Sequence, residues 1–120
     1  MGAQLVGAAF AFAADAHAAG KGLKPNEHAL LMFMALTALD TDASPRYFAA
    51  REQSAFALGR RVPDEPDPDD PDAESIEAER RAAFERVRAA TQGLVKAGAI
   101  KSVRRGRAGQ RAMYQLTLSR

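Results

Sequence analysis

Cysteine and tryptophan are both absent from the chain of 120 residues, and histidine occurs only as His17 and His28. A chain without cysteine forms no disulfide and no thiolate metal site. The two histidines lie in separate segments, so neither has a partner at the spacing of a metal site. We therefore expect no metal and no other cofactor, and no pattern indicates a pocket for a small-molecule ligand.

Long apolar runs are missing as well. The most apolar stretch, residues 4–19, is interrupted by Asp15 and His17 and lacks the basic start of a secretory signal peptide. No run approaches the roughly 20 apolar residues that a membrane-spanning helix needs. We therefore expect a cytoplasmic protein without membrane contact.

Patterns typical of enzymes are scarce. Six of the fifteen carboxylates fall in the proline-rich stretch 63–73, which cannot hold them as a preorganised catalytic pair. The stretch from Gly106 to Gly109 lacks the lysine and the following helix of a phosphate-binding loop. No nucleophile with a histidine base is recognisable. The sequence therefore predicts a protein that is not an enzyme.

Charge is abundant, and it is sorted by sign along the chain. Residues 1–62 carry six Lys and Arg against five Asp and Glu. Residues 63–79 carry nine acids and no base, whereas residues 80–120 carry eleven bases and a single acid, Glu85. Such a basic block suits a polyanion, and the phosphate backbone of nucleic acid is the usual one. A solvated basic face is the alternative, although it explains the segregation less well.

Apolar periodicity, together with the positions of proline and glycine, predicts a mainly helical chain that ends in a β-hairpin. The length allows one domain over residues 1–120 with one hydrophobic core. We expect an N-terminal helix within residues 1–22, a helix from Pro25 to about Asp40, a short extended stretch at 46–49, a short helix over 50–58, a long helix over 74–98 and a hairpin over 99–118.

Large apolar side chains are few, because many of the apolar residues are alanines. The expected core residues are Leu30, Leu31, Phe33, Met34, Leu36, Phe84, Val87, Leu94, Val95, Ile100, Tyr114, Leu116 and Leu118. The alanine-rich helix near the N-terminus has apolar residues on more than one side. We expect it to pack on the rest of the domain or on a second copy of the chain.

Residues 63–73 form an acidic loop, with four prolines and six acids in eleven residues. Proline and like-charge repulsion keep such a segment extended and exposed. Three roles stay open. The loop is a solvated spacer, an intramolecular mimic of DNA that shields the basic face, or a contact surface for a basic partner protein.

Three stretches resemble winged helix-turn-helix domains of bacterial regulators and of plasmid and phage replication proteins. They are Leu23–Glu27 followed by Leu30 and Leu31, the segment Ala55–Gly59, and Val87–Leu94 followed by Gly98–Ile100, a basic wing and Tyr114–Leu116. The resemblance implies that the long helix is a recognition helix for the major groove and that the hairpin is a wing. Two features depart from the pattern: Ser54 stands where a larger apolar residue is usual, and residues 60–73 replace a short turn.

The resemblance also implies which side chains contact DNA. On the recognition helix they are Arg81, Arg86, Arg88 and Gln92, and on the wing they are Arg104, Arg105, Arg107 and Arg111, with Arg51 at the start of the preceding helix touching the backbone. Arginine binds guanine O6 and N7 or pairs with phosphate, and it enters narrow minor grooves. The alternatives are helix arginines in i,i+4 pairs such as Glu77 with Arg81, and a solvated hairpin tip.

The predicted function is double-stranded DNA binding by a sequence-specific transcriptional regulator that can act as a homodimer. A replication or partition factor of a plasmid or phage is an alternative with the same chemistry. An adaptor that binds other proteins through a winged-helix scaffold is the alternative from a different class.

Overall fold

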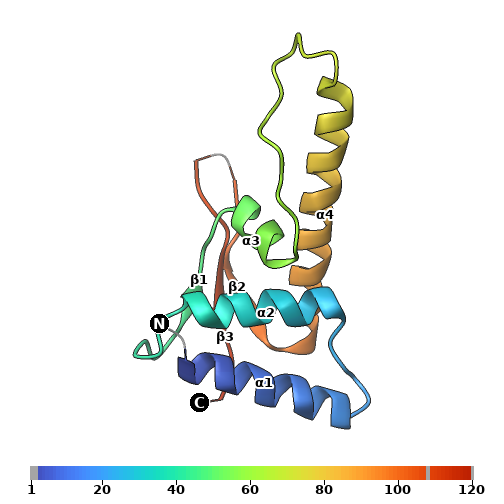
Figure 1. Ribbon diagram of the computed structural model, residues 1–120. Helices are drawn as coiled ribbons and strands as arrows, with labels where there is room; N and C mark the ends of the chain where they lie inside the picture. The colour runs from blue at the N-terminus through green and yellow to red at the C-terminus, as the bar shows by residue number, and fades with distance from the viewer. Residues whose placement is uncertain (1–2, 108, 120) are drawn as a thin grey trace.

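The computed structural model describes residues 3–107 and 109–119, and within them it has four helices and a three-stranded antiparallel sheet (Figure 1). In chain order the elements are α1 (Ala3–Ala18), α2 (Pro25–Thr37), β1 (Arg46–Tyr47), α3 (Arg51–Ala57), α4 (Ala73–Ala97), β2 (Ile100–Arg104) and β3 (Met113–Leu116). The expected mainly helical chain with a C-terminal hairpin is thus confirmed. None of these helices is long and apolar enough to cross a bilayer.

Carboxylates fix the starts of the first two helices. The Glu27 carboxylate accepts a hydrogen bond of 2.9 Å from the Lys24 N–H, one residue before α2. The Asp40 carboxylate accepts hydrogen bonds from the N–H groups of Gln4 and Leu5, at 3.0 and 2.9 Å. These bonds satisfy amides at the start of α1 and place a negative charge at the positive end of its dipole. The loop after α2 therefore helps to hold α1 in place.

The sheet has the strand order β1–β3–β2, and both pairings are antiparallel. β2 and β3 form the C-terminal hairpin, with Ile100 opposite Leu116. β1 adds two residues at the other edge of β3, where Tyr47 lies opposite Tyr114. The short extended stretch expected near residue 46 is therefore present, and it ties the segment before α3 to the hairpin.

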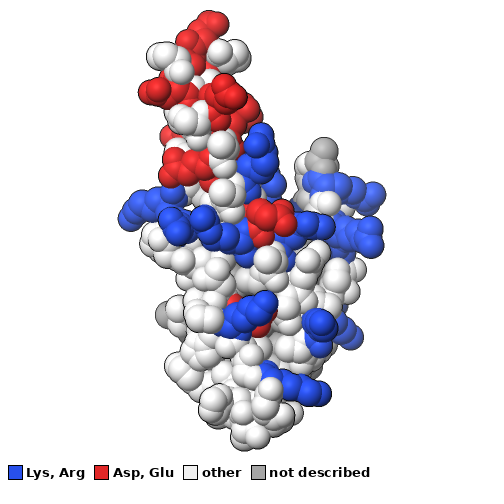
Figure 2. Space-filling view, turned by 90° about the vertical axis from the view of Figure 1, so that its right-hand side faces the viewer, with Lys and Arg blue, Asp and Glu red and all other residues white. Residues whose placement is uncertain are grey.

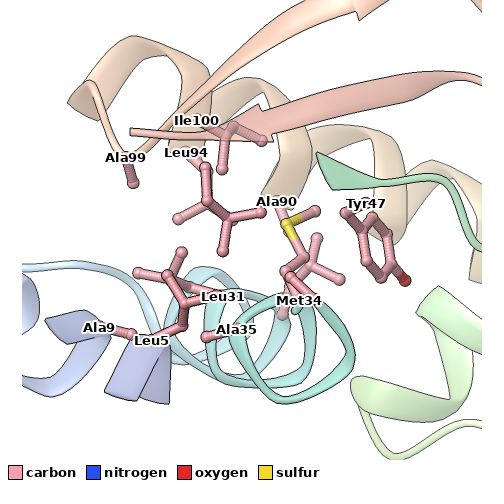
Figure 3. Packing of buried hydrophobic residues seen from close by; sticks show 13 residues of the cluster. Leu5, Ala9, Leu31, Met34, Ala35, Tyr47, Ala90, Leu94, Ala99 and Ile100 are labelled. Carbon is pink, nitrogen blue, oxygen red and sulfur yellow. The ribbon is translucent and has the colours of Figure 1, made fainter. Parts of the chain in front are cut away.

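One core joins α1, α2, α4 and the sheet. Leu5 of α1, Leu31 and Met34 of α2, Leu94 of α4 and Ile100 of β2 are all fully buried (Figure 3). Each such side chain stabilises the fold by roughly 1.5–3 kcal/mol relative to an exposed one. The core therefore holds the second half of α4 firmly against α2 and the hairpin.

Two of the expected core residues lie on the surface instead. Leu36 is 53% exposed and Val95 is 41% exposed. Each follows a buried residue, Ala35 or Leu94, by one position, which turns its side chain by about 100° around the helix. The prediction that these two residues belong to the core is wrong for that reason. The expected core also omitted Leu5, which is buried because α1 packs against α2.

The two halves of α4 are packed differently. The buried residues recur at helical spacing from Ala83 onward: Ala83, Val87, Ala90, Thr91 and Leu94. The first ten residues, 73–82, contribute no buried side chain. Gly98 ends the helix with φ at 84°, a left-handed conformation that glycine adopts without a steric penalty. The expected long helix is present, and its second half alone belongs to the core.

The first half of α4 belongs to an acidic arm, which we define as residues 63–79. The extended segment 63–72 runs beside the first turns of α4, and together they project from the body of the molecule (Figure 1). The radius of gyration is 15.5 Å, against about 13.6 Å for a compact domain of this length. A hydrogen bond from the Arg80 guanidinium to the Pro63 carbonyl closes the base of the arm.

Candidate nucleic-acid interface

A groove of about 1320 Å³ opens between α3, α4 and the tip of the β2–β3 hairpin. We call it the arginine groove, because six arginines from these elements line it: Arg51, Arg80, Arg81, Arg88, Arg107 and Arg111. Lys and Arg side chains gather in a band across the middle of the molecule, below the acidic arm (Figure 2). The end of the molecule opposite the arm carries few charges in the same view. The fold thus concentrates positive charge in one band below the acidic arm.

One row of polar side chains from α4 faces the arginine groove. Arg81, Glu85, Arg88 and Gln92 follow one another at intervals of four, three and four residues, and all four line the groove. This spacing places them along one side of the helix over about 16.5 Å. The row presents hydrogen-bond donors from arginine and glutamine, together with acceptors from Glu85 and Gln92.

Four acids also line the groove, so that its six arginines leave the lining with a net charge of +2. They are Glu52, Glu65, Glu77 and Glu85. Within residues 3–107 and 109–119 the one ion pair joins Arg88 Nη1 to Glu85 Oε1 at 3.2 Å, on a well-exposed part of α4. Exposed pairs of this kind contribute about 0–1 kcal/mol. The pair of Glu77 with Arg81 that the sequence offered as an alternative is not formed, and none of the other five arginines makes an ion pair with a described residue.

Phe84 connects the arginines of α3 and α4. The Cζ atom of Arg51 lies 4.1 Å from the centroid of the Phe84 ring, and the Cζ atom of Arg80 lies 5.3 Å from it. Arg80 lines the groove as well, although the sequence did not indicate it as a contact. Phe84 was expected in the core, but it is only half-buried and lines the groove. The spacing of Arg80 and Phe84 could have indicated their contact, since residues four apart on a helix are neighbours.

Short hydrogen bonds shape the hairpin tip. Arg107 and Gln110 exchange two backbone hydrogen bonds of 2.9 and 2.8 Å, and Arg107 Nε donates to Gln110 Oε1 at 3.0 Å. Gly109 has φ at 75°, as a left-handed turn position requires. Arg104 Nε donates to the carbonyl of Arg111 across the hairpin at 3.1 Å. The tip therefore holds Arg107 in a defined direction beside the groove.

Only some of the residues expected to contact DNA line the arginine groove. The groove collects Arg51, Arg81, Arg88, Gln92, Arg107 and Arg111. Arg86 instead lines a shallow hollow beside the start of α2, with Lys24 and Glu27. Arg104 and Arg105 lie on the hairpin outside the groove lining. Arg86 and Arg88 therefore face different sides of α4, because two residues turn a helix by about 200°.

The inner wall of the groove includes Tyr47, Ser54 and Tyr114. The Tyr47 hydroxyl and Ser54 Oγ are hydrogen-bonded at 2.7 Å, and both residues are buried. Burial raises the pKa of Tyr47, although the bond to Ser54 acts in the opposite direction, and burial also raises the pKa of Tyr114. Both phenols therefore stay neutral at physiological pH. The bond to Tyr47 gives the buried Ser54 hydroxyl a hydrogen-bond partner.

The described residues contain no group of three or more His, Asp or Glu side chains that could hold a metal ion. Comparisons of the chain with protein-family models, with curated proteins and with solved structures found no match.

Proposed function

We propose that the chain binds double-stranded DNA in the arginine groove, as a winged helix-turn-helix domain. The order of elements supports this proposal, since α2, β1, α3, α4 and the β2–β3 hairpin follow the winged-helix plan. In that plan α4 is the recognition helix and the hairpin is the wing. The pairing of β1 with β3 fits the plan as well, because it fixes the wing beside the helices.

The observation that carries the proposal is the convergence of six arginines on one groove. They come from α3, α4 and the hairpin, and of these six only Arg88 has an ion pair within the described residues. Fixed guanidinium groups with unused N–H donors suit phosphate oxygens and the O6 and N7 atoms of guanine. A duplex in the groove supplies both kinds of acceptor.

The acidic arm determines how the duplex docks on α4. Nine acids lie on residues 63–79, at the end of α4 that a recognition helix usually presents to the major groove. Phosphates repel that end, so the middle of α4 faces the bases instead. We assign base contacts to Arg81, Arg88 and Gln92, with the arm projecting beyond the duplex. Arg107 and Arg111 of the hairpin contact the backbone.

Selection of bound sites from a random duplex library tests this proposal. We expect enrichment of a defined site, and we expect that site to bind the protein more tightly than a scrambled duplex of the same length. Binding to both duplexes with equal affinity would remove the claim of a sequence-specific regulator and leave a general DNA-binding protein. No binding at low salt would overturn the proposal altogether.

A second candidate is an adaptor that binds another protein. Its support is a set of large apolar side chains that are more than half exposed on α1, on α2 and just after α2, namely Phe10, Leu36 and Leu39. The same surface suits a homodimer that places two domains on paired half-sites. Sedimentation of the free protein at high micromolar concentration separates these cases, since a dimer sediments faster than a chain that awaits a different partner.

A further inference from the structure

We propose that Phe84 is a positioning residue, which holds the guanidinium groups of Arg51 and Arg80 as a preformed binding pair for a phosphate of the DNA backbone. This inference rests on the proposed DNA binding and adds two contacts to it. Arg80 was not among the candidate residues, and Arg51 was expected only to touch the backbone.

The first observation is the geometry around the ring. Arg51 is the first residue of α3, and Arg80 lies one turn before Phe84 on α4. Both guanidinium carbons lie within 6 Å of the Phe84 ring centroid, at 4.1 and 5.3 Å, which is the range of an attractive cation–π contact. One ring therefore brings together charges from two separate helices.

The second observation is that these two arginines have no acidic partner among the described residues. Neither forms an ion pair with any described residue, and the one hydrogen bond of the Arg80 side chain goes to the neutral Pro63 carbonyl. Each guanidinium has five N–H donors, so most donors of this pair are unused. Two like charges near one ring repel each other, and a phosphate that accepts hydrogen bonds from both offsets that repulsion. All three residues line the arginine groove, where a backbone phosphate has access to them.

The third observation is that contacts within the protein already restrain the Arg80 side chain. Arginine loses rotamer freedom when it is ordered by a partner, and a side chain that is already stacked has less freedom to lose. Arg80 is held on two sides, by the ring and by the carbonyl of Pro63. We therefore expect the ring to contribute to affinity although it carries no charge.

The principal variant is Phe84→Leu, which keeps an apolar side chain of similar size but has no aromatic face. We expect duplex affinity to fall by about fivefold to thirtyfold, because two arginine side chains that the ring no longer holds must then be ordered when DNA binds. The salt dependence should stay the same, since both arginines remain charged. Arg51→Ala and Arg80→Ala should instead each reduce the slope of log K against log[salt] by about one. Phe84→Tyr, which retains the ring, should bind duplex DNA as the wild type does.

Phe56→Leu is the matched control. Arg61 lies 5.3 Å from the Phe56 ring, but neither residue lines the groove. This variant removes a comparable contact on the surface and should leave duplex affinity unchanged. The double variant Phe84→Leu with Arg51→Ala should lose less than the product of the two single losses, because the ring acts through the arginine.

NMR of the free protein separates failure of this inference from failure of the proposed function. The side-chain protons of Arg51 should be shifted upfield by the Phe84 ring, and the shift should disappear in Phe84→Leu. If the shift is present and the wild type binds duplex, while Phe84→Leu also binds normally, the positioning role is refuted and DNA binding stands. If the wild type binds no duplex, both are refuted. Equal losses in the Leu and Tyr variants would likewise refute the role of the ring.

Discussion

The two halves of α4 belong to the same helix but differ in charge and in packing. Residues 73–82 carry Glu74, Glu77 and Glu79 and contribute no buried side chain, whereas residues 83–97 supply Leu94 and four smaller residues to the interior. Acids in the first turns favour the helix dipole, which helps the unpacked half to stay helical. The arginines of α4 begin at Arg80, just after the arm, whose Glu65 and Glu77 also line the groove. The comparison indicates that core packing holds the C-terminal part of α4, whereas its N-terminal part is distinguished by its negative charge.

The difference in packing predicts the largest effect on stability. Leu94→Ala should lower the free energy of unfolding by about 2–5 kcal/mol, because it empties space in the core. Ile76→Ala, on the half-buried side of the arm, should cost less than about 1 kcal/mol. Urea denaturation measures both. Equal losses would show that the arm is part of the cooperative core.

We expect the inner wall of the groove to contribute more to stability than the acidic arm does. Ser54→Ala removes the hydrogen-bond partner of the buried Tyr47 hydroxyl and should cost about 1–3 kcal/mol of stability. The same change in a Tyr47→Phe background should cost much less, since no hydroxyl is then left without a partner. Thermal or urea unfolding of the four proteins gives the coupling directly. Independent, additive losses would mean that this bond does not stabilise the wall.

The two sides of α4 should differ in DNA recognition. Arg88→Ala should cost about 1–3 kcal/mol at the preferred site and relax the preference at one or two base pairs, because Arg88 faces the groove. Arg86→Ala is the matched control, since this arginine lies beside the start of α2 and should matter little. Titrations with the preferred and the scrambled duplex distinguish the two. A larger loss from Arg86→Ala would place the duplex on the other side of the helix.

Neutralising the arm should have the smallest effect. Replacing the six acids of residues 64–72 by Asn and Gln should raise affinity for preferred and scrambled duplex alike, by at most about threefold, because the arm's three acids on α4 stay in place and, of the six that are replaced, Glu65 alone lines the groove. Preserved discrimination would identify the arm as a spacer. A much greater gain for the scrambled duplex would instead support an arm that shields the groove from non-specific DNA.

The positions of the elements could be predicted well from the sequence, because local signals define them. Pro25 marks the start of α2, Gly98 marks the end of α4, and the run of prolines and acids marks the arm. The pairing of β1 with β3 could not be predicted, since it joins residues almost 70 positions apart and leaves no local pattern.

The choice of side on α4 was also beyond the sequence. Arg86 and Arg88 flank Val87 symmetrically, at about 100° on either side of the buried face. Periodicity identifies the flanks but does not say which flank meets the groove and which meets α2. The ring contact of Phe84 with Arg51 was missed for a related reason, because it depends on how α3 packs against α4.

The salt dependence of duplex binding tests the central claim most directly, namely that the arginine groove binds the phosphate backbone. If six to eight phosphates are neutralised, log K should fall with log[salt] at a slope of roughly −5 to −7. Arg107→Ala should weaken preferred and scrambled duplex by similar factors and reduce that slope by about one. A wild-type slope near zero, or a slope that Arg107→Ala leaves unchanged, would contradict the assignment of this groove to DNA.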